Sequence, residues 1–282
     1  TNTQEAQRRC GNNVVTNCII GGITAEEVGG ILGHQVNIGY DTWSRTARVF
    51  SNACIDSTVT GATDVGGIIG TTKRYTSSNN YSNATVSAVA PSKVTITGEG
   101  TNAGGIIGSI NKTATYALSE TPRVYSCYFA GTVSANDYVG GIIGRCYQEV
   151  YGDNRDLMVT GNVCVTSDIL NPHIQFIANR ISDAGGEFQE CTVYKNASMI
   201  YGTSQIEQTA EQYYNGTTTN VVTGLTPAQQ MAADHVTLIT SADLKNKEFW
   251  TKKTGNVKVG FTTNPEYWCF EGLANGYMPY VT

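Results

Sequence analysis

A six-residue block constrains this chain more than any other feature: valine or alanine, two glycines, two aliphatic residues and a third glycine. It occurs four times, at residues 28–33, 65–70, 103–108 and 139–144, so that its copies lie 37, 38 and 36 residues apart. A fixed period of this length is typical of proteins that stack one structural repeat on the next. We expect the paired glycines at sharp corners or at close backbone approaches, where a Cβ atom would collide.

A second recurring element precedes each block. It is a short strand-like stretch that ends in a small residue, and two degenerate copies follow the fourth block. The small residues are Cys18, Cys54, Ala84, Cys127, Cys164 and Cys191. In a stack of repeats these residues would form a narrow interior column, and because alanine replaces one cysteine we expect free thiols rather than disulfides. The state of Cys10, Cys146 and Cys269 stays open, and residues 174–178 fall where a fifth block is due.

The pattern changes near residue 200. Thr226-Pro227 predicts a short helix over 228–233, and Ser241 predicts the start of another over 242–252, with an aromatic-rich tail after it. We therefore divide the chain into a repeat region, 1–200, and a C-terminal spacer and capping segment, 201–282, that seals the last repeat. The predicted fold is all-β: a parallel β-solenoid (β-helix) of about 37-residue repeats, right-handed, with a small C-terminal α+β cap.

Composition excludes several classes of function. The net charge is −5 and only 15% of residues are charged, which argues against nucleic acid as a partner and gives no basic face for a membrane. No apolar run approaches the roughly 20 residues that span a bilayer. The sequence shows no signal-peptide pattern, so we expect either a cytosolic protein or a mature fragment, and the abundance of Thr, Asn and Tyr favours the fragment.

Few residues are spaced for catalysis or metal binding, and we predict no catalytic residue, metal or cofactor. The three histidines, His34, His173 and His235, are far apart, and the glycine block lacks the Lys-Ser/Thr ending of a phosphate loop. Four residues that precede the blocks could stack to bind Ca²⁺ or could simply cap turns: Glu27, Asp64, Asn102 and Asp137. One group resembles the paired carboxylates of glycosidases, with a solvated loop as the alternative: Glu149, Asp153 and Asp156.

Aromatic residues mark the segments that follow the blocks. They are Tyr40, Trp43, Tyr75, Tyr81, Tyr116, Tyr147 and Tyr151. If these segments lie side by side, the rings form a stripe that could stack on sugars or anchor a protein partner. The alternative is that the long loops pack on themselves. We take these seven residues as the predicted ligand-binding set.

The blocks and the Asn-Cys or Ser-Cys strands before them resemble the GLUG-motif family of bacterial surface proteins over roughly residues 10–195. The pattern Ser241-Ala-Asp-Leu, Phe249-Trp250, Trp268 and Gly276-Tyr-Met-Pro279 is similar to the closing segment of Bacteroidetes cell-surface adhesins. The resemblance implies export to the outer-membrane surface, often as a lipoprotein, and an adhesin-like role.

We therefore expect a monomeric, non-enzymatic binding protein outside the cell. Its partner would be a glycan or protein on a host or neighbouring cell, and an N-terminal lipid anchor missing from this sequence would provide the only membrane attachment. A polysaccharide-active β-helix enzyme and a structural stalk that presents another domain are the alternatives.

Overall fold

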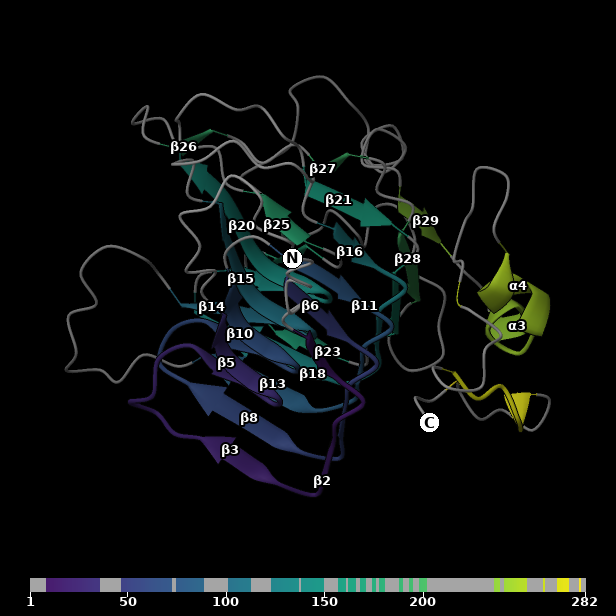
Figure 1. Cartoon of the computed structure of the whole chain (residues 1–282), viewed down its shortest axis with the longest axis horizontal. Coiled ribbons are helices and arrows are strands. Elements are labelled where there is room, and N and C mark those ends of the chain that lie inside the picture. The colour runs from purple at the N-terminus through teal and green to yellow at the C-terminus, as the bar shows by residue number, and fades with distance from the viewer. Residues whose placement is uncertain are drawn as a thin grey trace, which may run out of the picture.

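The computed structural model describes most of the N-terminal half of the chain and parts of the rest. The described residues are 9–35, 47–72, 75–88, 101–112, 123–136, 138–149, 157–160, 162–165, 168–170, 174–175, 178–180, 188–189, 193–194, 198–201, 236–238, 241–252, 261, 268–273 and 279. Within them the fold is mostly β, with five parallel sheets and two short helices near the C-terminus (Figure 1). The predicted all-β fold with parallel sheets is confirmed.

Up to β25, each sheet collects every fifth strand along the chain. Sheet A contains β1 (Arg9–Gly11), β6 (Ala47–Phe50), β11 (Tyr75–Ser78), β16 (Arg123–Tyr125), β21 (Leu157–Thr160) and β27 (Val193–Tyr194). Sheet B contains β2 (Val14–Thr16), β7 (Ala53–Ile55), β12 (Tyr81–Ser82), β17 (Tyr128–Phe129), β22 (Val163–Val165), β28 (Ser198–Tyr201) and β29 (Val236–Leu238). Sheet C contains β3 (Ile19–Gly21), β8 (Thr58–Gly61), β13 (Thr85–Ala88), β18 (Thr132–Ala135) and β23 (Asp168–Leu170).

The glycine blocks supply the last two sheets. Sheet D contains β4 (Val28–Gly29), β9 (Val65–Gly66), β14 (Asn102–Gly104), β19 (Tyr138–Gly140) and β24 (Ile174–Gln175). Sheet E contains β5 (Leu32–Gln35), β10 (Ile69–Thr72), β15 (Ile107–Lys112), β20 (Ile143–Glu149) and β25 (Ala178–Arg180). One further strand, β26 (Phe188–Gln189), pairs with β20 and is antiparallel to it.

Five consecutive strands, one on each sheet, make one pass of the chain. The first pass is β1–β5, the second β6–β10, the third β11–β15, the fourth β16–β20 and the fifth β21–β25. The first residues of the four blocks pair with one another, Val28 with Val65, Val65 with Ala103, and Ala103 with Val139. Ile174 pairs with Val139 in turn. The predicted alignment of the blocks and of the degenerate fifth copy is therefore confirmed, and each repeat makes one pass.

Apolar side chains from all five sheets fill the interior. Leu32, Ile69, Ile107 and Ile143 pair in register along sheet E, and the three isoleucines are fully buried. Each such side chain stabilises the fold by about 1.5–3 kcal/mol relative to leaving it exposed. A Cβ atom on Gly67 would collide with the backbone carbonyl oxygen of the next pass, which confirms the close approach predicted for the paired glycines.

The predicted column of stacked small residues is wrong in its alignment. Cys54 and Cys164 share one column, but Ser82 and Phe129 lie between them. Cys127 directly precedes Tyr128, which pairs with Tyr81, so Cys127 belongs to a different column. Small side chains at adjacent positions look alike in the sequence, whereas the register is set by backbone pairing and by the buried valines of sheet C.

The prediction of free thiols is confirmed for Cys18, Cys54, Cys127 and Cys164. Cys10 and Cys269, whose state the sequence left open, are free as well. Cys191 and the side chain of Cys146 lie outside the described residues.

The C-terminal segment packs on the outer face of sheet B. Two short helices, α3 (Ser241–Leu244) and α4 (Lys247–Thr251), replace the single helix predicted over 242–252, because Asn246 caps α4 by accepting a hydrogen bond from the backbone N–H of Glu248. A second apolar cluster joins this segment to the sheet, and Figure 1 shows the helices to one side of the strands. The buried residues of this second cluster are Ala53, Tyr128, Val163, Leu244, Phe249, Trp250, Phe261, Trp268 and Leu273.

The cluster contacts strands of the second, third, fourth and fifth passes. The seal over the last repeat stays a prediction, because most of residues 201–282 lie outside the described residues. The helix predicted over 228–233 and most of the aromatic tail lie outside the described residues. No helix in the described part of the chain is long and apolar enough to cross a membrane.

Candidate functional site

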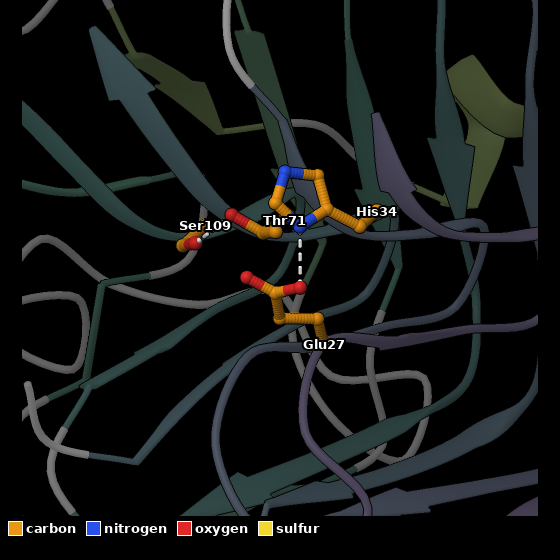
Figure 2. A network of polar contacts seen from close by, with 4 residues as sticks. All are labelled: Glu27, His34, Thr71 and Ser109. Carbon is orange, nitrogen blue, oxygen red and sulfur yellow. Dashed lines mark hydrogen bonds and ion pairs between the residues drawn. The ribbon is translucent and has the colours of Figure 1, made fainter. Parts of the chain in front are cut away.

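Each glycine block folds its two ends together. A Cβ atom on Gly33 would lie 2.7 Å from the carbonyl oxygen of Glu27, so a side chain cannot fit between the strand that enters the block and the strand that leaves it. The residue before the block and the residue after it, seven positions later, therefore lie side by side. In the first pass the Glu27 carboxylate pairs with His34 Nδ1 (Figure 2). In the fourth pass the Arg145 guanidinium carbon lies 5.1 Å from the centre of the Tyr138 ring, a cation–π contact.

Strand pairing repeats these neighbours from pass to pass. On sheet E, residues 34, 71, 109 and 145 pair in register, and Figure 2 shows three of them along neighbouring strands. On sheet D, the residues that enter the block follow the same register. We name the combined set the polar row: Glu27, Asp64, Asn102 and Tyr138 before the blocks, and His34, Thr71, Ser109 and Arg145 after them.

In the middle of the polar row, the side chains form hydrogen bonds with one another. The Thr71 and Ser109 hydroxyls lie 2.7 Å apart, and Asn102 Nδ2 donates to Asp64 Oδ1. All four residues are buried. By contrast, the side chains of Glu27 and His34 are 38% and 31% exposed. The accessible chemistry of the row therefore lies at its ends.

The predicted series of stacked acidic and amide residues is confirmed for three members and wrong for the fourth. Tyr138, not Asp137, pairs with Asn102, because Tyr138 directly precedes the fourth block whereas Asp137 stands two positions before it. Asp137 itself lies outside the described residues. Within the described part of the chain, no three His, Cys, Asp or Glu side chains gather as a metal site would require.

The predicted aromatic set is described only in part. Tyr40, Trp43, Tyr116 and Tyr151 lie outside the described residues. The other three belong to three different sheets, Tyr75 to β11 on sheet A, Tyr81 to β12 on sheet B and Tyr147 to β20 on sheet E, and only Tyr81 has a described side chain. These three backbone positions therefore do not form one stripe.

Tyr81 faces the C-terminal segment. Its ring stacks on the Tyr128 ring at 5.1 Å, and Tyr128 meets Trp250 edge-on at 5.3 Å. Burial raises the pKa of Tyr81 to about 12, and it raises the pKa of Tyr128 further. Both phenols are therefore neutral at physiological pH, and the three rings join sheet B to α4.

The other predicted chemical groups are mostly outside the described residues. This holds for His173, His235, Asp153 and Asp156, and for the side chain of Glu149.

Sequence reasoning missed a ladder of asparagines at the turn from sheet A to sheet B, which is buried except at its first member. Asn13 Nδ2 donates to Asn52 Oδ1 at 2.9 Å, and Asn52 Nδ2 donates to Asn80 Oδ1 at 3.0 Å. Asn162 fills the same position in the fifth pass, where its Oδ1 accepts from the backbone N–H of Cys127 at 2.9 Å. Such amide ladders stabilise stacked parallel strands.

A left-handed backbone residue precedes each of the first four ladder positions. These residues are Asn12, Ser51, Asn79 and Ser126, with φ between 51° and 59°. An asparagine at a constant offset before each strand of sheet B was the available signal. It was hidden because Cys127 takes the position in the fourth pass, and because the predicted alignment of the repeats rested on the cysteines.

The chain has no match among family models, curated proteins or solved structures. The resemblance to GLUG-motif proteins and to adhesins stays a prediction.

Proposed function

We propose that this chain is a parallel β-solenoid that acts as a non-enzymatic binding protein at a bacterial cell surface. Its ligand would be a glycan or a protein on a host or neighbouring cell. One observation carries the proposal: in each of the first four passes the chain leaves sheet E after a glycine block and re-enters at sheet A, so these connections start and finish at one corner of the structure. Connections that emerge together from a constant core are where repeat proteins place their binding residues.

Four of the seven predicted aromatic residues belong to these connections. Tyr40 and Trp43 fall between β5 and β6, Tyr116 between β15 and β16, and Tyr151 between β20 and β21. Aromatic rings supply flat faces for sugars and anchors for protein partners.

The polar row lies where these connections begin. His34 and Arg145 belong to strands of sheet E, from which these connections start, and His34 is one residue before the end of β5. The exposed Glu27–His34 pair supplies a carboxyl group and an imidazole for hydrogen bonding. A ligand at this corner would therefore meet aromatic and polar groups side by side, which is the composition of a specific binding surface.

The buried thiols support a binding role rather than cysteine chemistry. Burial raises the pKa of Cys54 and of Cys127 to about 11, and that of Cys164 further. The thiolate is the nucleophilic form, so these cysteines are unreactive near neutral pH.

A glycan and host-matrix binding array with the full chain tests the proposal. We expect at least one probe to bind, and a triple variant, Trp43→Ala, Tyr116→Ala and Tyr151→Ala, to lose at least about tenfold in affinity. The matched control is Tyr125→Ala, an exposed tyrosine on β16 that precedes a block instead of following it. Circular dichroism confirms that both variants fold.

Three results would contradict the proposal. The array could stay silent, the triple variant could bind as tightly as the original chain, or the chain could turn over a glycan. Turnover would favour the polysaccharide-active alternative.

A further inference from the structure

The first pass leaves one end of all five sheets open. Among the described residues, β1, β2, β3, β4 and β5 are each the last strand of their sheet, and each pairs with the second pass on one side only. Figure 1 shows β2 and β3 at the lower end of the sheets, with β8 above β3. The free side of such a strand presents a row of backbone N–H and C=O groups, which is a template for pairing with another strand.

Interior apolar side chains are incompletely buried at this open end. Val15, Ile20 and Leu32 are only partly buried, whereas the residues that pair with them in the second pass are fully buried: Cys54, Val59 and Ile69. The second pass has a neighbour on both sides, so one more pass over the first would complete the burial.

The glycine blocks restrict what can occupy the open end. A Cβ atom on Gly30 would collide with the Gly67 carbonyl oxygen of the second pass, and a Cβ atom on Gly67 would collide with the Gly105 carbonyl oxygen of the third. By the same geometry, a segment that docks on the first pass meets the carbonyl oxygen of Gly30. Only glycine fits at that position of the docking segment.

We propose that the open end binds a polypeptide that carries the same glycine-block repeat, which adds parallel strands to all five sheets. The interface is the one already formed between consecutive passes, with the same register and the same alternation of apolar residues. Residues 1–8 contain no glycine and therefore lack the residue that this position requires. If two copies of the chain met through their open ends, the strands of the two first passes would run antiparallel. The five strands of one copy would then not pair in order with the five edge strands of the other. The inference is independent of the proposed adhesive role, because it concerns the end of the sheets and not the corner between sheets E and A.

The test uses a synthetic peptide of residues 47–72, which is one complete pass with its block, and the full chain. We expect saturable one-to-one binding by isothermal titration calorimetry, with slower amide hydrogen exchange over residues 14–33. In the peptide, Gly67→Ala should weaken binding at least about tenfold, because the added Cβ atom would meet the Gly30 carbonyl oxygen. The control peptide, Thr60→Ala, changes an outward-facing and partly exposed residue and should bind normally.

A variant of the chain tests the open edge itself. The Cys18 carbonyl oxygen and the Gly22 N–H both bond to the second pass, so strand alternation turns the N–H of Ile19 toward the open side. Ile19→Pro removes this donor and should abolish peptide binding, whereas Ile19→Ala keeps it and should bind. Equal thermal midpoints show that the two variants are folded alike.

Absence of peptide binding, or equal binding of the Gly67→Ala peptide, would overturn the proposal. So would concentration-dependent self-association in the ultracentrifuge that Ile19→Pro abolishes, because the occupant would then be a second copy of the chain.

Discussion

Removal of one asparagine from the ladder should destabilise the protein far more than its size suggests. Asn80 is fully buried and makes four hydrogen bonds. Its Nδ2 donates to the Val49 carbonyl oxygen at 3.0 Å and to Ser77 Oγ at 2.8 Å, and its Oδ1 accepts from the N–H and the Nδ2 of Asn52, both at 3.0 Å. The substitution Asn80→Ala removes all four bonds and adds no group that can replace them.

The expected cost follows from the groups left behind. The Val49 carbonyl and the Asn52 N–H belong to fully buried residues that water does not reach. Each buried backbone group without a partner costs about 1–3 kcal/mol, so the two together predict a loss of about 2–6 kcal/mol in the free energy of unfolding. This loss is a large fraction of the roughly 5–15 kcal/mol by which a typical domain is stable.

The matched control is Asn13→Ala, which removes the exposed end of the same ladder. Water can replace the bonds of Asn13 to Asn52 and Gly11, so we expect a loss of about 1 kcal/mol or less. Urea unfolding followed by circular dichroism measures both variants, and the slopes should agree with that of the original chain. Equal losses at the two positions would show that burial does not set the strength of the ladder, and would refute the reasoning.

Three further outcomes are expected. Gly67→Ala should cost about 1–3 kcal/mol in urea unfolding, because its Cβ atom collides with the Gly105 carbonyl oxygen and forces neighbouring passes apart. Tyr128→Phe should leave stability unchanged or raise it by up to about 1 kcal/mol, since the buried hydroxyl has no hydrogen-bond partner among the described residues; a clear loss would reveal one. Burial raises the pKa of Cys54 and Cys127 from 9.0 to about 11, so the folded thiols stay protonated while unfolded ones ionise. The stability they contribute is fully present below pH 9 and falls between pH 9 and 11, by up to roughly 3 kcal/mol per thiol. In a pH series of unfolding curves, replacing both with alanine should reduce this slope.

The sequence predicted the positions that tolerate only one kind of residue. Gly30 and Gly67 sit where any side chain would meet a backbone carbonyl, so glycine recurs at the same place in each copy. That requirement made the blocks visible and gave their register correctly from Val28 to Val139.

The predicted alignment of the cysteines was wrong because their position in the fold does not require one kind of residue. The column of Cys54 and Cys164 also holds Ser82 and Phe129, so it does not exclude large residues and leaves no consistent mark on the sequence. Only part of the candidate site could be predicted from the sequence. Glu27, Asp64 and Asn102 could be found from their place before the blocks, but the contacts that they make could not.

The sequence by itself determined the period of the repeat, the parallel all-β fold and the close backbone approach at the glycine blocks. These features follow from steric rules that act on each copy separately. Only the tertiary structure decided which side chains meet: His34 with Glu27, Arg145 with Tyr138, and the asparagines with one another. The physical reason is that each of these contacts depends on how a corner closes or how two passes align, and residues 7 to 39 positions apart carry no local signal of that alignment.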